Sequence, residues 1–306
     1  MRDKKKLSER DICTKFITPA LESAGWDKMT QFNEEVGLKI TDGKIIVKGK
    51  LYMQTKAVRA DYVLYYKPNM PIAIIEAKDN NHSVRAGMQQ ALRYREYLQD
   101  VPCVYSTNGD AFLEHDFTQS NGLLEREIPL NEFPSPEELW KRYKKQHKIE
   151  KEAISKIAEQ DYFYDPTGRK PRYYQQIAIN RIVEAIAKGQ KRILLVLATG
   201  TGKTYVAFQT IYRLWKSGAK KRILFLADRN ALVRQTKTGD FKHFGEALTV
   251  IRKKKIDKSY EIYLALYQGL TNYDEDTDAY KQFSPDFFDL IVIDECHRGS
   301  AKEDSA

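Results

Sequence analysis

The sequence has few cysteines, no long apolar run and no low-complexity tract. Its three cysteines, Cys13, Cys103 and Cys296, are far apart and form no C-x-x-C pair. This spacing argues against a disulfide framework and a zinc site, and it fits a reducing, cytoplasmic compartment. Apolar runs end after about six or seven residues, so no segment is expected to span a membrane. The N-terminal stretch lacks the apolar core of a secretory signal.

What is present is the composition of an ordinary globular protein, with 42% hydrophobic and 30% charged residues. A length of 306 residues exceeds that of one typical domain. The net charge of +9 favours a polyanionic partner such as nucleic acid, although a solvated basic surface would give the same value.

Residues 1–118 are expected to form one small α/β domain. A helix is predicted over 8–24, where Ser8 and Asp11 can form a capping box and Gly25 ends the apolar pattern. Pro19 is expected to kink or shorten this helix. The rest of the pattern predicts a hairpin of strands 36–40 and 44–48, strands 58–66 and 71–78, a helix over 84–98 and a strand over 101–107.

Residues 119–170 are expected to form a connector, because three prolines between 129 and 136 and a run of charged residues leave little apolar surface to bury. Its middle, 136–158, can be helical. From 171 to 306, apolar runs alternate with helical patterns. The predicted strands are 193–198, 222–227, 262–267 and 289–294, a pattern typical of a mostly parallel sheet covered by helices.

Strands 58–66 and 71–78 are predicted to form a second hairpin, with two carboxylates and an ammonium group at one end of it. If partner positions on its strands sum to 137, Asp61 lies opposite Glu76, and Lys78 shares that face. Two like charges this close cost energy unless a cation joins them, and carboxylate oxygens suit Mg²⁺. Lys78 could then orient or deprotonate a water that attacks phosphorus, and stabilise the developing charge. A surface ion pair on an edge strand is the alternative interpretation.

The segment 193–204 predicts a phosphate-binding loop. Its apolar run ends in Thr199-Gly200-Thr201-Gly202-Lys203-Thr204, and a helical pattern follows at once. Glycines allow backbone N–H groups to close on phosphate oxygens, Lys203 supplies a positive charge, and Thr204 offers a hydroxyl to Mg²⁺. The strict pattern has a glycine where Leu197 stands, and a glycine-rich strand–helix turn is the alternative.

A second apolar run, 287–293, ends in Asp294 and Glu295. Two carboxylates at the end of a buried strand suit a metal ion and a hydrolytic water.

The hairpin with Asp61, Glu76 and Lys78 resembles the site of the PD-(D/E)xK nucleases. Asp61 and Glu76-Ala77-Lys78 match the motif, and Ala60 stands where that family often has proline. The resemblance implies a restriction-endonuclease-like fold, with Asp61 and Glu76 as metal ligands and Lys78 as a catalytic residue. Gln90 and Tyr94 resemble the QxxxY motif of the RecB-like branch and, one helical turn apart, can hold DNA backbone or water. Glu9 resembles an extra acidic residue of some branches, although a solvated first-turn charge explains it equally well.

The later motifs resemble, in order, those of a superfamily-2 helicase, which implies a RecA-like P-loop domain. Residues 172–175 resemble the adenine-reading Q motif, in which Gln175 reads the base edge; Gln176 is the alternative register. Residues 198–204 resemble motif I. Residues 226–236 and 267–270 resemble the nucleic-acid-contacting motifs Ia and Ib. Residues 294–297 resemble a DEAH-type motif II, where Asp294 would hold Mg²⁺ and Glu295 would position the hydrolytic water.

A nuclease joined to such a motor resembles the R (restriction) subunit of a type I restriction–modification enzyme, along nearly the whole chain. The resemblance implies ATP-driven translocation of double-stranded DNA, Mg²⁺-dependent cleavage, and partner methylation and specificity subunits. A single-chain helicase–nuclease of another defence or repair system is the alternative, and a non-enzymatic DNA-binding module is a third possibility.

The sequence is also expected to be an N-terminal fragment that lacks motif III. In motors of this fold the motif III strand lies between the motif I and motif II strands. Either a gap in the second sheet between 193–198 and 289–294, or a strand taken from elsewhere, is therefore expected.

Overall fold

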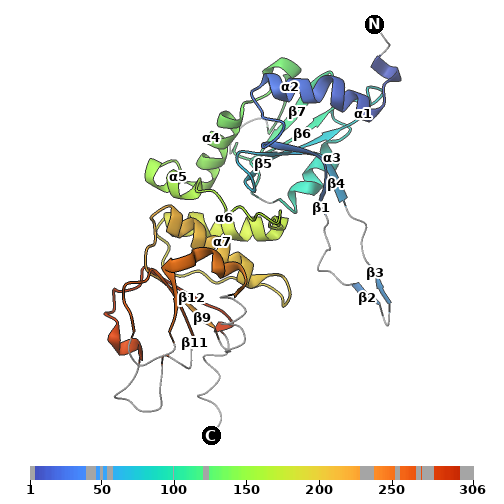
Figure 1. Ribbon diagram of the computed structural model, residues 1–306. Coiled ribbons are helices and arrows are strands. Elements are labelled where there is room, and N and C mark those ends of the chain that lie inside the picture. The colour runs from blue at the N-terminus through green and yellow to red at the C-terminus, as the bar shows by residue number, and fades with distance from the viewer. Residues whose placement is uncertain are drawn as a thin grey trace. The chain divides into compact units, whose positions relative to one another are not determined.

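The computed structural model describes residues 4–38, 46–48, 51–53, 58–98, 100–119, 124–227, 238–251, 256–266, 270 and 279–296, with side chains left out over 35–58. The chain forms two compact units (Figure 1). Unit 1 comprises 1–155 and 165–177, and unit 2 comprises 156–164 and 178–306. Within the described ranges, no helix is long and apolar enough to cross a membrane.

Unit 1 is built on a six-stranded mixed sheet in the order β1-β4-β5-β6-β7-β8. Only β5 and β6 pair in parallel; the other neighbours are antiparallel. Strands β2 and β3 form a separate two-stranded ladder. The strands are β1 (Phe32–Leu38), β2 (Ile46–Lys48), β3 (Leu51–Met53), β4 (Val58–Tyr65), β5 (Pro71–Ala77), β6 (Cys103–Thr107), β7 (Ala111–Asp116) and β8 (Glu125–Pro129).

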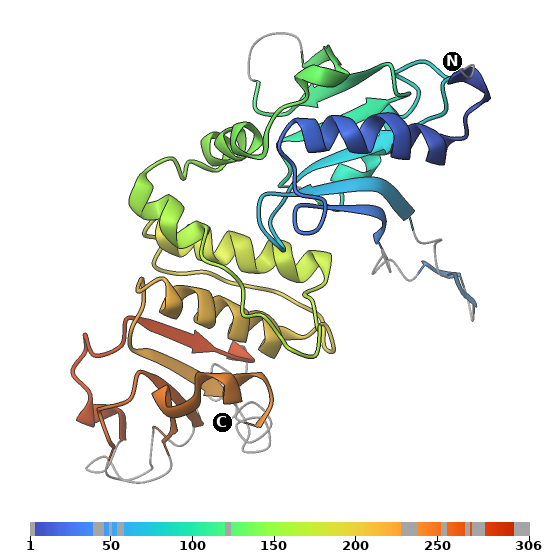
Figure 2. The same ribbon diagram turned by 45° about the horizontal axis from the view of Figure 1, so that its top comes forward.

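Helices cover both faces of this sheet. The N-terminal helical segment lies across one face (Figure 2), where Thr18 is hydrogen-bonded to Tyr62 of β4. Helix α3 packs on the opposite face against Val63, the next residue of β4, and against Ile74 and Val104. The helices of unit 1 are η1 (Lys4–Lys6), α1 (Glu9–Ile12), η2 (Cys13–Ile17), α2 (Thr18–Ser23), α3 (Met88–Arg95), η3 (Leu130–Glu132), α4 (Pro136–His147) and most of α5 (Glu152–Ala158).

The N-terminal helix confirms the predicted capping box, in which Ser8 and Asp11 satisfy each other's backbone N–H groups. The helix is continuous through 9–23, but η2 in its middle has the wider π geometry. Pro19, in the first turn of α2, has no backbone N–H to donate into the preceding turn. Pro19 does not shorten the helix, which continues to Ser23, and the irregularity in the described residues is the π segment that precedes the proline.

The expected hairpin of 36–40 and 44–48 does not match the observed pairing. Strand β1 pairs with β4, and β2 pairs with β3. The predicted turn, 41–43, lies outside the described residues.

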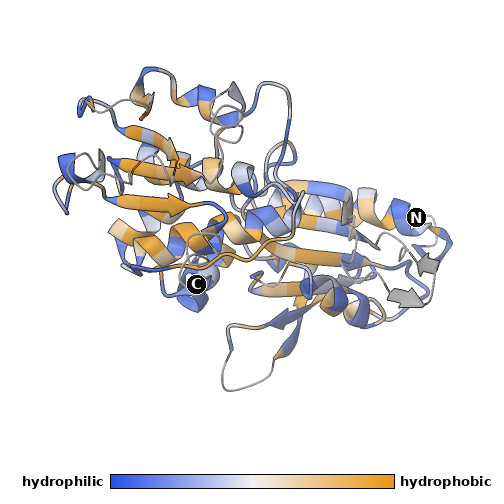
Figure 3. Cartoon of the chain, turned by 90° about the horizontal axis from the view of Figure 1, so that it is seen from below, coloured by the Kyte–Doolittle hydropathy of each residue, from blue (hydrophilic) through white to orange (hydrophobic). Residues whose placement is uncertain are grey.

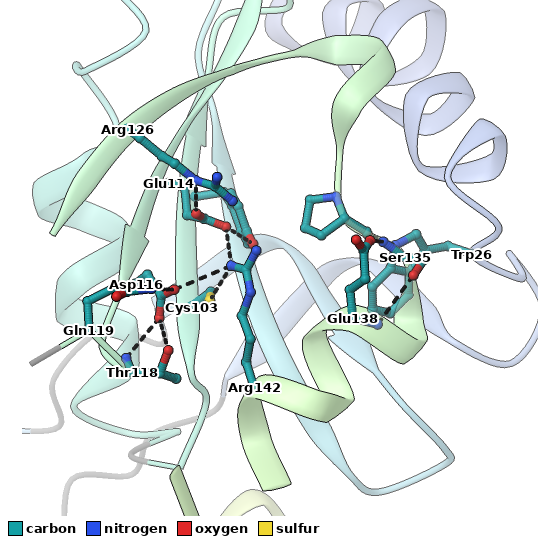
Figure 4. A network of polar contacts seen from close by, with 12 residues as sticks. Trp26, Cys103, Glu114, Asp116, Thr118, Gln119, Arg126, Ser135, Glu138 and Arg142 are labelled. Carbon is teal, nitrogen blue, oxygen red and sulfur yellow. Dashed lines mark hydrogen bonds and ion pairs between the residues drawn. The ribbon is translucent and has the colours of Figure 1, made fainter. Parts of the chain in front are cut away.

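The segment 119–170 differs from the expected connector, because much of it packs into unit 1. Strand β8 extends the sheet. Arg142 connects α4 to the sheet by donating a hydrogen bond to Glu114 of β7 (Figure 4). The buried carboxylate of Glu114 accepts hydrogen bonds from Arg142 (2.6 Å), Arg126 (2.5 Å) and the Tyr105 hydroxyl (2.7 Å). A buried charge is tolerated when it is paired and hydrogen-bonded in this way. As predicted, much of 136–158 is helical, in α4 and α5.

Unit 2 contains a parallel sheet in the order β10-β11-β9-β12. Its strands are rich in apolar residues (orange in Figure 3), and the aromatic residues of α7 and η4 cover β9 and β11. The elements are α6 (Tyr173–Ala187, shared with unit 1), α7 (Lys203–Lys216), β9 (Ile223–Ala227), η4 (Asp240–Ala247), β10 (Leu248–Val250), β11 (Ile262–Leu266), η6 (Ala279–Gln282) and β12 (Leu290–Ile293).

The segment that enters unit 2 before α6 is fastened to α7 by a buried arginine. The Arg213 guanidinium donates to the carbonyls of Ala158 and Gln160 and to the side chain of Asn180. It also lies over the ring of Tyr162. Each of the three guanidinium nitrogens thus donates a hydrogen bond inside unit 2.

The prediction of a buried strand over 193–198 is wrong. This segment is neither helix nor strand, and Leu194 and Val196 are 75% and 81% exposed. Among the described strands, β12 has a neighbour on one side only, and its Ile291 and Ile293 are half exposed. An apolar run forms a strand only when a neighbour satisfies its backbone groups. Because 193–198 is not a strand, the described residues do not include the two strands between which the gap was expected.

Candidate active site and nucleotide-binding loop

The β4–β5 hairpin has the register that the sequence predicts. Tyr62 pairs with Ile75 and Leu64 with Ala73, so partner numbers sum to 137 as far as an irregularity at Leu64 and Tyr65. Asp61 and Glu76 come next in this register. The Asp61 carboxylate reaches across the hairpin and accepts a hydrogen bond of 2.7 Å from the backbone N–H of Ala77.

The Glu76 side chain is buried, with 2% exposure, and its two oxygens have different surroundings. Oε1 accepts a hydrogen bond of 2.6 Å from Lys78 Nζ, which also donates to the carbonyl of Ala77. Oε2 is buried and has no hydrogen-bond partner within the described residues. A buried carboxylate oxygen without a donor is costly, and a cation placed beside it would remove that cost.

Burial and the nearby Asp61 carboxylate raise the pKa of Glu76 to about 8. Both effects disfavour the charged form, and the contact with Lys78 opposes them only in part. Burial lowers the pKa of Lys78, but the hydrogen bond from Lys78 to Glu76 and the nearby carboxyl groups of Glu76, Glu9 and Asp61 together outweigh it, and the net pKa of Lys78 is raised. Lys78 is therefore a protonated, positively charged group at neutral pH.

The three auxiliary residues predicted from the sequence also lie at or beside this site. Glu9 Oε2 on α1 is 3.7 Å from Lys78 Nζ, and burial raises the pKa of Glu9 although Lys78 lowers it. Gln90 and Tyr94 on α3 are hydrogen-bonded to each other at 2.5 Å. Burial is the main cause that raises the pKa of Tyr94 to about 12, with contributions from Glu76 and Asp61.

Contacts between the N-terminal turn and the loops beside this site are not predictable from the sequence. The N-terminal turn η1 is tied to the loop that follows Lys78, since Asn81 donates to the carbonyl of Lys5 at 2.9 Å. Lys4 also donates to the carbonyl of Gly109 and to Asp110. These contacts join residues 76 to 106 positions apart, so no local pattern could reveal them.

Asp61 and Glu76 are the residues that would hold a metal ion. The described residues contain no group of three or more His, Cys, Asp or Glu side chains placed to hold one. The fit to a cation therefore rests on two carboxylates, one of them with a buried oxygen that lacks a donor. Oxygen donors of this kind suit Mg²⁺, which keeps several waters as ligands and needs few from the protein.

In unit 2, the predicted phosphate-binding loop has two glycines in left-handed geometry. Gly200 and Gly202 have φ of 80° and 84°, and α7 begins directly afterwards, at Lys203. The start of a helix is a place where backbone N–H groups can bind an anion. Thr201 closes the turn by donating to the carbonyl of Ala198 at 2.6 Å, while Thr199 is exposed and Thr204 half-buried.

The predicted phosphate-binding lysine and the predicted water-positioning glutamate are in direct contact. Lys203 Nζ lies 2.6 Å from Glu295 Oε1. Glu295 follows β12, and the backbone N–H of Asp294 donates to the carbonyl of Leu226 on β9. Glu295 has a φ of 52°, a left-handed conformation that is uncommon outside glycine and is found at functional turns.

The structure gives less evidence on the predicted roles of Gln175 and of the remaining helicase-like motifs. The Gln175 side chain is buried and accepts a hydrogen bond from the backbone N–H of Arg172 at 2.9 Å, while Gln176 donates to Asn69 and to the carbonyl of Pro171. Residues 228–236 of predicted motif Ia, 267–269 of Ib and His297 lie outside the described residues.

Comparison with known proteins matches both halves of the chain. A family model described as "Type III restriction enzyme, res subunit" matches residues 169–306. The chain is 56% identical over 301 residues to the "Type I restriction enzyme EcoAI endonuclease subunit" of Escherichia coli, covering 98% of this chain and 37% of that subunit. It is 32% identical over 296 residues to the EcoKI endonuclease subunit of E. coli strain K12, covering 78% of this chain and 24% of the relative.

The fold also matches a solved structure. A fragment of a protein described as an HsdR subunit of a type I restriction enzyme from Vibrio vulnificus YJ016 superposes with a TM-score of 0.76 at 40% identity. The match covers 95% of this chain and 52% of the solved one. The chain thus spans well under half of the two E. coli subunits. On the identity over nearly its whole length and on the shared fold, the chain is a homologue of the endonuclease (HsdR) subunit of type I restriction enzymes.

Proposed function

We propose that this chain carries the DNA-cleaving site and part of the ATP-driven motor of a type I restriction endonuclease. The observation that carries the nuclease assignment is the convergence of Asp61, Glu76 and Lys78, with one Glu76 oxygen buried and without a donor. The β4–β5 hairpin, the parallel β5–β6 pair and the covering helices support a restriction-endonuclease-like nuclease domain in unit 1. The names of the relatives support the same assignment.

In this proposal Asp61 and Glu76 hold Mg²⁺, which would neutralise the attacked phosphodiester and increase the acidity of a water molecule. Lys78 stabilises the negative charge that develops on phosphorus oxygens. Its raised pKa favours this role over that of a base, because a protonated amine cannot accept the proton of the attacking water. Glu9, Gln90 and Tyr94 orient water or the DNA backbone beside this centre.

The motor part would use ATP. The loop 199–204 and the start of α7 cradle the phosphates, Lys203 pairs with them, and Thr204 and Asp294 hold the nucleotide's Mg²⁺. Glu295 positions the hydrolytic water, and Gln175 reads the adenine edge. The observed Lys203–Glu295 ion pair supports this assignment, because it brings the phosphate-binding and water-positioning groups within 2.6 Å of each other.

As a subunit of a larger enzyme, the protein would translocate double-stranded DNA and work with methylation and specificity subunits. A basic chain of net charge +9 is suited to a polyanionic partner. The alternative, a single-chain helicase–nuclease, is tested by purification of the full-length protein. Co-purification of separate methylation and specificity subunits supports the type I assignment, and activity without them contradicts it.

The nuclease proposal is tested by Lys78→Ala in the full-length enzyme, with Lys141→Ala as the matched control. Lys141 is an exposed lysine of α4, outside the site. Lys78→Ala should abolish DNA cleavage and leave DNA-stimulated ATP hydrolysis nearly unchanged, whereas Lys141→Ala should change neither. Normal cleavage by Lys78→Ala would show that the assigned centre does not cut DNA.

A further inference from the structure

The backbone conformation does not explain why residue 87, beside the proposed metal site, is a glycine. Gly87 precedes α3 with φ −86° and ψ −10°, a conformation open to any residue. Glycine is therefore not required there for the turn. The reason lies in space: a Cβ at Gly87 would stand 2.9 Å from Glu76 Cγ and 2.9 Å from Ser106 Oγ.

These neighbours have little freedom to move away. Glu76 is buried, and its contact atom is the middle of the side chain rather than its end. Ser106 is fully buried, and its hydroxyl accepts from the backbone N–H of Gly87 at 3.1 Å and donates to the carbonyl of Val84. The Cβ and Cγ atoms of Glu76 thus occupy the space that a side chain at position 87 would need.

The sheet register places Ser106 directly beside Glu76. The two are paired positions on the parallel strands β5 and β6. Ser106 therefore fixes the start of α3 at the strand position next to the carboxylate. The same helix carries Gln90 and Tyr94, so one hydroxyl sets the spacing between the two sides of the site.

We propose that Gly87 and Ser106 are positioning residues that hold the Glu76 carboxylate where it can bind a divalent cation. This inference rests on the proposed nuclease function. In metal sites, groups that orient a ligand contribute about 10–100-fold to metal affinity. Adding a methyl group at Gly87 should displace Glu76 and weaken metal binding by about tenfold or more.

The test measures Mn²⁺ binding to the full-length, nucleotide-free subunit by electron paramagnetic resonance, and DNA cleavage by the assembled enzyme. The variants are Gly87→Ala, Ser106→Ala and Asp61→Ala. Ala86→Ser is the matched control, since it adds one atom at the exposed preceding residue. Gly87→Ala should weaken the Mn²⁺ site that Asp61→Ala removes, and should raise the Mg²⁺ concentration for half-maximal cleavage. The Mg²⁺ dependence of ATP hydrolysis in the same reactions should stay unchanged.

Ser106→Ala keeps the space and removes only the hydroxyl, so it should weaken Mn²⁺ binding in the same direction but less. It serves as the test if Gly87→Ala fails to fold. Wild-type Mn²⁺ affinity in both variants, with or without a loss of cleavage, would overturn the positioning role. If Asp61→Ala cleaves normally and keeps every Mn²⁺ site, the nuclease proposal itself fails, and this inference fails with it.

Discussion

Metal binding at the proposed nuclease site should release a proton from Glu76. Because its pKa is raised to about 8, Glu76 is mostly protonated at pH 7 in the metal-free protein. A carboxylate must lose its proton to bind a cation. At one pH unit below the pKa the group holds about 0.9 proton, and at one unit above it about 0.1. Saturation with Mn²⁺ should therefore release about 0.9 proton per site at pH 7 and about 0.1 at pH 9.

The same linkage fixes the direction of the affinity change. Binding should weaken about tenfold for each pH unit below about 8 and become independent of pH above it. The assay mixes nucleotide-free, full-length subunit with Mn²⁺ in weakly buffered solution containing an indicator dye. Glu76→Gln is the control, since the amide keeps the shape but carries no proton to release. Equal proton release by wild type and Glu76→Gln at pH 7 would refute the reasoning.

Further predictions concern the folded-state charge, the motor and the packing. The free energy of unfolding of the metal-free protein should receive its full contribution from Glu76 below pH 4.5 and lose it as pH rises through about 8, which urea unfolding at several pH values can show. Lys203→Ala in the full enzyme should eliminate ATP hydrolysis and therefore cleavage; cleavage at the normal rate would mean that cutting does not need the motor. Arg213→Met should destabilise unit 2 by roughly 3 kcal/mol, because the buried carbonyl of Ala158 and the partly buried carbonyl of Gln160 lose their donor; an unchanged unfolding midpoint would contradict this. Within 119–170, limited trypsin should cut first after Arg169, which is exposed and outside any helix or strand, rather than in 124–155.

The hairpin at the site was predictable because its determinants are local. A short turn between two apolar runs fixes the pairing, so the proximity of Asp61 and Glu76 follows from counting outward from the turn. The cap at Ser8 and the left-handed glycines before Lys203 follow from equally short patterns. The orientation of the Glu76 carboxylate was not predictable, because Gly87 and Ser106 reach it from other elements.

Two errors have one physical cause, which is that burial depends on distant partners. Residues 193–198 are apolar enough for a buried strand, yet no described strand pairs with them. Conversely, the charged run of α4 suggests an exposed connector, but Trp140 and Tyr143 on one face of that helix are buried. Arg142, which counts toward the charge run, binds the buried Glu114. Composition alone cannot distinguish a solvated charge from one with a partner in the sheet.

No described strand pairs with the outer side of β12, and this has a consequence for handling the chain in solution. A strand edge with exposed Ile291 and Ile293 can act as a template for another extended segment, and the exposed Leu194 and Val196 belong to such a segment. Two copies could exchange these segments, or stack them into insoluble aggregates. We therefore expect self-association of this polypeptide to rise with concentration. Ile291→Lys, which places a charge on the strand edge, should suppress it, and so should Leu194→Lys, which places a charge on the segment that would pair with that edge.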